Sequence, residues 1–574
     1  MYNVHMQRVN NKCARLRECF DMNGKITVNI MGVGKVEAEC GVSLFELSEK
    51  YAEKFLRPAL IARVDSELHD LSHKMLFDSD IEFLDIKNPQ GFRAYQRGVA
   101  FLMIYAAKEV LGKKTRVVIS HSINKNYCCE LPEMEGSITD ELLSKIEKVM
   151  RDTVEKDLPL EKHAISKEQA LHICEELGFN DKISLLKYRH NQTYSFYNLG
   201  WFYNYIYGEM PPCTGRLGQF KLIKRAHGFM LQFPNAANNY ELVELAPENR
   251  LSEVFAESNR WARIMKTDTV GALNDRLCQS GSGEIIRVAE ALHEKKIALL
   301  ADRIMQEQRS IVLIAGPSSS GKTTFASRLG VQLRVNGAIP HVISLDNYYL
   351  NRDDCPRDED GNYDFETIDA IDTAQINKDL RDLLDGKRVE IPRFNFYAGR
   401  REYNGNYLKL TEADVLILEG IHGLNERVSG GVPSDDKFKI FISALTQINL
   451  DDHNRIPTTD ARLMRRMVRD FLYRGASAQV TIDMWPRVLL GEIKYIYPCQ
   501  EHADAFFNSA LVYEMSVLKQ YAEPLLFGIE PDEPQYTEAR RLIKFLSSFL
   551  GVPSETLPPN SILREFVGGS CFTH

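Results

Sequence analysis

IVLIAGPSSSGKTT, residues 311–324, decides the fold, because in it an apolar run passes into a loop bracketed by glycines. The pattern G-x-x-x-x-G-K-[ST] starts at Gly316 and ends at Thr323. Gly316 and Gly321 allow a turn so tight that successive backbone N–H groups point at one anion. The helix that follows directs its first N–H groups at the same anion. The sequence therefore predicts a phosphate-binding loop between a strand and a helix.

Two side chains of this loop indicate a nucleoside triphosphate with its metal ion. Lys322 supplies a mobile positive charge for the outer phosphates, and the hydroxyl of Thr323 is placed to ligate Mg²⁺. The expected nucleotide-binding residues are Gly316, Pro317, Ser318, Ser319, Ser320, Gly321, Lys322, Thr323 and Thr324. The alternative is an ordinary Gly/Ser turn, but the apolar strand before the loop and the helix pattern after it make a chance match less frequent.

Length and charge narrow the class of protein. The 574 residues exceed the roughly 250–300 at which a single core stops growing, so several domains are expected. The formal net charge of −8 disfavours nucleic acid as a partner and gives no reason for attraction to anionic membranes. No run approaches the ~18 apolar residues of a membrane span, and the eleven cysteines lack metal-ligand spacing. We expect a cytoplasmic protein without membrane association, and leave a homo-oligomer open.

Apolar runs alternate with helix patterns from Arg309 onward. They are Ile311–Ala315, His341–Leu345, Asp414–Leu418 and Phe438–Ile442. Continuous runs of this kind are typical of parallel strands covered on both faces. The sequence predicts an α/β fold of the P-loop nucleotide-binding type with a parallel sheet over residues 309–574.

Polar residues follow three of these runs, where ligands bind to parallel sheets. Phosphoryl transfer requires cations around the moving phosphate and a base for the acceptor hydroxyl. Lys322 is a candidate catalytic cation, Asp346 is the candidate base, and Glu419 with Thr323 is the candidate Mg²⁺ site. A helix cap or a surface turn is the alternative role for either acid.

A run of arginines follows the last strand. Arg462, Arg465, Arg466 and Arg469 fall on neighbouring helical turns, and Arg474 lies just past them. Guanidinium groups arranged in this way could close on phosphates, whereas a solvated helix face is the alternative. We single out Arg469 and Arg474 as catalytic candidates.

In this half, the motifs resemble those of the uridine kinase/phosphoribulokinase class over roughly residues 311–476. The stretches that carry the resemblance are SLDNYY (344–349), GNYDF (361–365), IPRFNF (391–396), LEGI (418–421) and RRMVRDFLYRG (465–475). The resemblance implies a kinase that uses ATP and Mg²⁺, with Asp346 as general base for a ribose 5′-hydroxyl and the arginine helix as a lid. It also implies a nucleoside pocket at Tyr349 and Tyr363, with Phe394 and Phe396 in the base-binding stretch.

Departures from the class leave the acceptor open. The base-binding stretch of uridine kinases typically has Tyr-Asp-Phe and a nearby histidine, where this chain has Phe394-Asn395-Phe396. An insertion, Leu445–Thr459, precedes the arginine helix. The first hypothesis is a kinase of a uridine- or cytidine-like ribonucleoside, and the alternatives are a phosphoribulokinase-like sugar kinase and a regulatory NTPase.

The N-terminal half resembles the front of threonyl-tRNA synthetases. CGVSLFEL (40–47) and PALIARVD (58–65) are similar to an α+β TGS domain, and GEMPPCTGRLGQFKL (208–222) is similar to the second additional, or editing, domain. That domain carries two histidines four apart, here Arg97 and Phe101, and a Cys-x-x-x-His, here Ile206 and Met210. The resemblance therefore implies a degenerate domain without editing activity, used for regulation, gating or assembly.

The expected domain order follows from these motifs. It is an N-terminal extension (1–23), a TGS-like domain (24–91), a degenerate synthetase-editing-like domain (92–245), a helical connector (246–308) and a P-loop uridine kinase-like domain (309–574).

Overall fold

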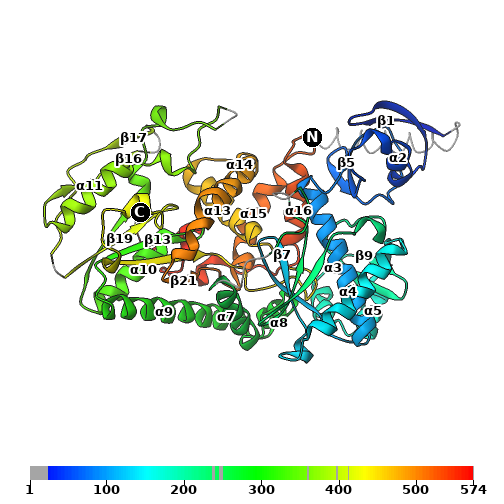
Figure 1. Cartoon of the computed structure of the whole chain (residues 1–574), viewed down its shortest axis with the longest axis horizontal. Helices are drawn as coiled ribbons and strands as arrows, with labels where there is room; N and C mark the ends of the chain where they lie inside the picture. The colour runs from blue at the N-terminus through cyan, green and yellow to red at the C-terminus, as the bar shows by residue number, and fades with distance from the viewer. Residues whose placement is uncertain are drawn as a thin grey trace. The chain divides into compact units, whose positions relative to one another are not determined.

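The computed structural model describes residues 24–235, 239–244, 250–358, 361–395, 398–411 and 413–572 (Figure 1). The chain divides into two compact units. Unit 1 comprises Met1–Pro247, Asn449–Arg455 and Glu530–Thr537, and unit 2 comprises Glu248–Ile448, Ile456–Ile529 and Glu538–His574. Two short segments of the C-terminal half therefore group with the N-terminal half. The expected N-terminal extension, 1–23, lies outside the described residues.

Unit 1 begins with a small α+β module. Its sheet has the order β2-β1-β5-β3-β4, built from β1 (Lys25–Ile30), β2 (Gly34–Glu39), β3 (Ile61–Val64), β4 (Glu67–His69) and β5 (Ser79–Leu84). Alternate residues of β1 are buried, so Ile26, Val28 and Ile30 face the core. Helix α2 (Leu44–Lys50) starts where Ser43 and Glu46 form a capping box.

The second part of unit 1 is organised around the long helix α3 (Pro89–Leu111). Asn88 caps this helix and Pro89 occupies its first position, so it starts earlier than the Tyr95 of the sequence pattern. Its further elements are β6 (Val118–Ile123), β7 (Asn126–Glu130), α4 (Asp140–Glu155), β8 (Glu161–Ser166), α5 (Lys167–Leu177), α6 (Asn180–Lys187), β9 (Thr193–Leu199), β10 (Phe202–Tyr205), β11 (Lys221–Arg225) and β12 (Gly228–Gln232). The strands form two sheets with the orders β11-β12-β7-β6 and β10-β9-β8.

The residues at the four positions where the synthetase domain would carry ligands have packing roles in this structure. Arg97 donates from Nε to the carbonyl oxygen of Glu209 at 2.8 Å, and the ring of Phe101 packs against Phe202. Ile206 and Met210 are buried in the same apolar core. Among the described residues no cluster of three or more His, Cys, Asp or Glu side chains could hold a metal ion.

Unit 2 opens with three helices, α7 (Arg250–Ile264), α8 (Val270–Ser280) and α9 (Ser282–Gln306). The region is helical where the structure describes it, as expected, and its role as a connector stays a prediction. Gly281 separates α8 from α9 with φ +69°, a conformation that favours glycine.

The core of unit 2 is a parallel sheet with the strand order β14-β19-β13-β20-β21. Its strands are β13 (Ile311–Ala315), β14 (Ile339–Ser344), β19 (Asp414–Glu419), β20 (Lys437–Ser443) and β21 (Ala505–Asn508). The four apolar runs of the sequence are confirmed as strands, and β21 is an edge strand that the sequence pattern did not indicate. Every residue of β13 and β19 is buried, as expected for the inner strands of a covered sheet.

Further helices and short paired strands complete the C-terminal half, of which Tyr536 and Thr537 group with unit 1. They are α10 (Lys322–Val335), α11 (Thr373–Leu384), β15 (Val389–Glu390), β16 (Arg393–Asn395), β17 (Arg400–Glu402), β18 (Tyr407–Leu408), α12 (Glu426–Ser429), α13 (Thr458–Arg474), α14 (Ala478–Gly491), α15 (Glu514–Phe527), α16 (Tyr536–Leu546) and α17 (Arg564–Val567). In the part of the chain that the structure describes, no helix is long and apolar enough to cross a bilayer.

Candidate active site

The phosphate-binding loop joins β13 to α10, and its glycines are required by close approaches. A Cβ atom on Gly316 would lie 2.1 Å from the carbonyl oxygen of Ile442, so no larger residue fits. Gly321 has φ +82° and faces Ile562. The Nζ of Lys322 donates to the carbonyl oxygens of Gly316 and Pro317 at 3.1 and 3.2 Å, so the lysine lies folded along its own loop.

Two hydroxyl groups of the loop are buried without a hydrogen-bond partner in the described structure. The Oγ atoms of Ser319 and Ser320 have no hydrogen-bond partner among the described residues. Buried polar atoms are nearly always hydrogen-bonded, so orphaned donors around a helix N-terminus fit an anionic ligand. Arg466 also donates to the Oγ of Ser318 at 2.9 Å, which places a guanidinium group at the loop.

Glu419 ends β19 beside the loop, where the sequence predicted a metal ligand. It is 4% exposed, and the hydroxyl of Thr323 donates to its Oε1 at 3.3 Å. Burial, reinforced by the charge of Asp346, raises the pKa of Glu419 to about 7. A carboxylate and a hydroxyl are a fitting partial set of protein ligands for Mg²⁺, which usually completes its shell with phosphate oxygens and water.

Asp346 lies in a single 3-10 turn, Leu345–Tyr348, that directly follows β14. Its N–H donates to the Oγ of Ser344 at 3.4 Å. Its negative charge contributes to raising the pKa values of Glu419, Glu366 and Tyr349. The structure therefore brings the candidate base into one electrostatic cluster with the candidate metal ligand.

Sequence reasoning missed Glu366, which belongs to the same cluster. Its Oε2 atom is buried and has no hydrogen-bond partner within the described chain. Burial raises the pKa of Glu366 to about 7, opposed in part by the positive charge of Arg466. Its place in the sequence could have singled out this residue, because it directly follows the stretch GNYDF.

The structure separates the predicted substrate aromatics into two groups. The rings of Tyr349 and Phe394 meet edge to face at 6.0 Å between centroids, and the Tyr349 hydroxyl donates to the carbonyl oxygen of Phe365 at 3.0 Å. Tyr363 instead stacks on Phe365 at 5.6 Å, with the guanidinium group of Arg357 over its ring. Phe396 lies outside the described residues.

Two arginines of α13 contact the backbone of the loop and are not available to cover a ligand. Arg462 and Arg465 are 1% and 0% exposed, and each forms an ion pair, with Glu492 and Glu514 respectively. Both also donate to loop carbonyls, those of Ser318 at 3.2 Å and Ser319 at 3.4 Å. The expectation that all the arginines close on phosphates is therefore wrong for these two, because opening a buried ion pair leaves an uncompensated charge.

The two arginines predicted to be catalytic share one acid. Arg469 and Arg474 lie 2.9 and 3.6 Å from the same carboxylate oxygen of Asp470. The side chain of Arg474 is 52% exposed, so it is the more accessible of the two. Their part in catalysis stays a prediction.

A turn near the C-terminus contacts the end of the phosphate loop. The Oε2 of Glu565 accepts hydrogen bonds from the hydroxyl and the N–H of Thr324 at 2.9 and 3.3 Å. Ile562 and Phe566 of the same turn are fully buried. The sequence assigned no chemistry to this tail, and the structure places a carboxylate of it at the start of α10.

Comparison with known proteins agrees with this geometry. The model of the phosphoribulokinase/uridine kinase family matches residues 311–516. The uridine kinase of Lactobacillus johnsonii is 31% identical over 206 residues, which make up 35% of this chain and 87% of that protein. The chain belongs to the phosphoribulokinase/uridine kinase family. The uridine kinase of Saccharomyces cerevisiae is 30% identical over 202 residues, 35% of this chain and 36% of that protein.

The N-terminal region is similar to threonine–tRNA ligases, as the sequence indicated. The ligase of Syntrophotalea carbinolica is 28% identical over 173 residues, 30% of this chain and 27% of the ligase. The chain thus spans about a quarter of that ligase's length.

Among solved structures, a possible uridine kinase of Bacillus stearothermophilus has a TM-score of 0.27 at 18% identity and covers 37% of this chain and 98% of its own. The D-glycerate 3-kinase of Cryptococcus neoformans has a TM-score of 0.20 at 13% identity, covering 44% and 87%. Independently of these structures, the C-terminal half has an α/β fold with a parallel sheet, and the family match lies within this half.

Proposed function

We propose that the protein is a Mg²⁺-dependent kinase that transfers the γ-phosphate of ATP to the 5′-hydroxyl of a ribonucleoside of the uridine or cytidine type. The observation that carries the proposal is the cluster of Asp346, Glu366 and Glu419 beside a loop with unpartnered hydroxyls. Such a cluster combines an anion cradle, a metal ligand and acids that can receive acceptor hydroxyls.

Each residue has a task that its position supports. Lys322, Arg466 and the N–H groups at the start of α10 hold the phosphates of ATP. Thr323 and Glu419 would hold Mg²⁺, which supplies neutralisation of the phosphate charge. Asp346 accepts the proton of the acceptor hydroxyl as that oxygen attacks the γ-phosphate.

Of two features of the acceptor region, the second favours a nucleoside over a simple sugar. The unpartnered oxygen of Glu366 can accept a hydrogen bond from an acceptor hydroxyl, which both substrate classes offer. The edge-to-face pair of Tyr349 and Phe394 adds an aromatic surface, and a flat base gains more from it than a pentose does. A phosphoribulokinase-like sugar kinase is the alternative.

We also propose that residues 24–91 form a TGS-like domain and that residues 92–245 form a synthetase-editing-like domain without editing activity. The packing roles of Arg97, Phe101, Ile206 and Met210 support the loss of that activity.

The test is ADP release from the purified chain with ATP and Mg²⁺ across ribonucleosides, pentoses and ribulose 5-phosphate, with Asp346→Ala in parallel. Stimulation by a pyrimidine nucleoside that is lost in the variant supports the proposal. Stimulation by sugars alone favours the alternative, and slow hydrolysis that ignores every acceptor indicates a regulatory NTPase.

A further inference from the structure

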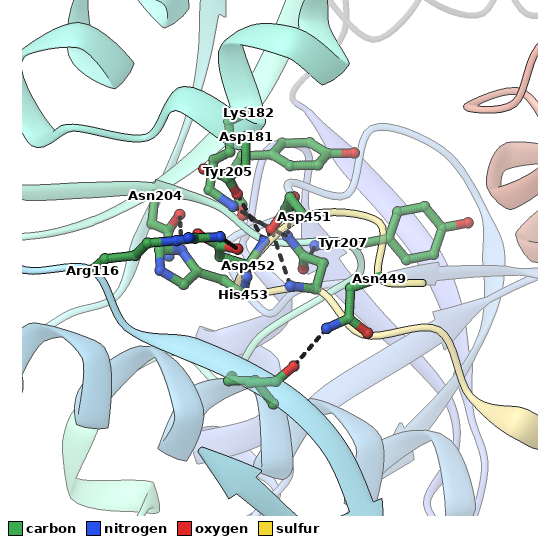
Figure 2. Close-up of polar contacts among 12 residues, drawn as sticks. Arg116, Asp181, Lys182, Asn204, Tyr205, Tyr207, Asn449, Asp451, Asp452 and His453 are labelled. Carbon is green, nitrogen blue, oxygen red and sulfur yellow. Dashed lines mark hydrogen bonds and ion pairs between the residues drawn. The ribbon is translucent and has the colours of Figure 1, made fainter. Parts of the chain in front are cut away.

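The middle part of the insertion before the arginine helix belongs to unit 1. Residues Asn449–Arg455 group with the N-terminal half of the chain, although both neighbouring stretches belong to unit 2. Figure 2 shows this segment surrounded by side chains of unit 1. We refer to Asn449–Arg455 as the docked segment.

A buried ion pair anchors the docked segment. The Nζ of Lys182, on α6, lies 2.5 Å from the Oδ1 of Asp451, and the two side chains are 1% and 0% exposed. Asp451 also accepts hydrogen bonds from the backbone N–H groups of His453 and Asn454 at 2.9 and 3.0 Å. Burying a charge is costly unless partners are supplied, and here the chain supplies them to Asp451.

Asp452 is held through its side chain and its backbone. Its carboxylate receives two hydrogen bonds from Arg116, at 2.7 and 2.9 Å (Figure 2). Its N–H donates to the Oδ2 of Asp181 at 2.7 Å, and its carbonyl oxygen accepts from the N–H of Ile119 at 2.8 Å. The fork of a guanidinium on a carboxylate fixes orientation as well as position.

The remaining contacts reach the end of β10 and the residue Tyr207 that follows it. Asn454 accepts from the N–H of Tyr207 at 2.8 Å and donates to the carbonyl oxygen of Tyr205 at 3.0 Å. The Nδ1 of His453 lies 3.2 Å from the Oδ1 of Asn204. These contacts flank Ile206, one of the four positions where the synthetase domain would carry ligands. The docked segment therefore occupies the surroundings of the lost site with residues of the chain itself.

The docked segment leads directly into the helix that holds the phosphate loop. Helix α13 begins at Thr458, three positions after Arg455. Arg462 and Arg465 of α13 donate to carbonyl oxygens of the loop, and Arg466 donates to the hydroxyl of Ser318. So short a connection limits how far the start of α13 can move while the segment stays docked.

We propose that unit 1 holds Asn449–Arg455 as a tether, and that docking or release of this tether changes the hold of α13 on the phosphate loop and thereby kinase turnover. The ligand-like partner of the degenerate domain is then a segment of this chain, not an external substrate. Docking of the segment does not depend on which acceptor the kinase uses, and only the turnover readout rests on the proposed function.

The test releases the segment in the full-length chain. Asp451→Lys places two lysines together in the buried site and is expected to expel the segment. Arg116→Gln is a milder variant, since the Arg116 side chain is 44% exposed and its loss is tolerated more easily in folding. Lys187→Met, at an exposed position of α6, is the matched control.

Two readouts separate docking from coupling. Trypsin cleavage after Arg455 and amide exchange at Ile119 report docking, and both are expected to rise about tenfold or more in Asp451→Lys. ATP affinity, measured by calorimetry, and ADP release report coupling, and a change of about 5-fold or more is expected in at least one of them. Lys187→Met is expected to match the wild type in all four.

The outcomes test the docking of the segment and its coupling to the phosphate loop separately. Unchanged protection of Arg455 and Ile119 in Asp451→Lys and in Arg116→Gln would overturn the docking. Release with wild-type ATP affinity and turnover would overturn the coupling. If Asp451→Lys does not fold, as judged by near-ultraviolet circular dichroism, Arg116→Gln carries the test. If no acceptor supports turnover in the wild type, the proposed function fails while ATP affinity still decides the coupling.

Discussion

The docked segment and the phosphate loop are both buried and polar, but they differ in how their polar groups are satisfied. In the docked segment, Asp451 and Asp452 meet donors from the chain itself. At the loop, the hydroxyls of Ser319 and Ser320 and one oxygen of Glu366 are buried without partners in the described structure. The two carboxylates of the first region are satisfied within the chain, whereas the hydroxyls and the carboxylate oxygen of the second could be satisfied by a ligand. Burial alone therefore does not distinguish a binding site from a structural cluster.

The largest expected effect tests whether the second region is the catalytic one. Asp346→Ala is expected to lower turnover by roughly 10²–10⁴-fold while ATP affinity stays within a few-fold, because general-base catalysis contributes about that much. Steady-state kinetics and calorimetry measure the two quantities. Asp353→Ala, at an exposed acid in the following turn, is the control. Near-normal turnover of Asp346→Ala would remove it from the role of base.

The next effect tests whether the buried charge of Asp451 depends on its cation within the chain. Lys182→Met is expected to lower the free energy of unfolding by about 3–5 kcal/mol, because it leaves Asp451 buried without its cation. The double variant Lys182→Met, Asp451→Leu is expected to regain part of that loss, since no charge remains unpaired. Urea denaturation measures both variants. A double variant less stable than the sum of the two single changes would contradict this account.

A smaller effect concerns the unpartnered oxygen of Glu366. Glu366→Gln keeps the size of the side chain but removes its capacity to accept on both oxygens, so the KM for the acceptor is expected to rise by roughly 5–150-fold, about 1–3 kcal/mol. ATP affinity is expected to change little. An unaltered acceptor KM combined with lower thermal stability would mean that Glu366 is structural.

The smallest effect is a pH dependence from Glu419. Its pKa is raised from 4.5 to about 7, so the protonated form stabilises the fold. That contribution is fully present below pH 4.5 and is lost as the pH rises through about 7. Without Mg²⁺, the wild type should therefore lose more stability than Glu419→Gln between these two values, as thermal melts would show. Mg²⁺ affinity should move the opposite way, increasing with pH, because the ion requires the carboxylate.

Local sequence patterns predicted the parts of the fold that depend on residues close together in the chain. The runs that became β13, β14, β19 and β20 are continuous and apolar, and the glycines and lysine of the loop follow at fixed spacing. Strand β21 is short and lies at the sheet edge, so its pattern is weak. The sheet could therefore be predicted except at its margin.

The parts that could not be predicted depend on contacts between distant residues. Glu366, Glu492 and Glu565 reach the site from separate stretches, and no local pattern says which carboxylate meets which donor. The insertion Leu445–Thr459 stood out in the sequence as a departure from the family. The residue that contacts this insertion could not be predicted from the sequence, because Lys182 and Asp451 are 269 positions apart.

The contact between Thr324 and Glu565 has a consequence for the timing of synthesis. The two residues are 241 positions apart, so the phosphate loop leaves the ribosome well before the turn that completes it. At about 5–20 residues per second, the wait is on the order of 10–50 s. During that interval the N-terminal end of α10 lacks both the carboxylate of Glu565 and the apolar cover of Ile562. The nascent chain therefore acquires its nucleotide site late, after the N-terminal half has had time to fold.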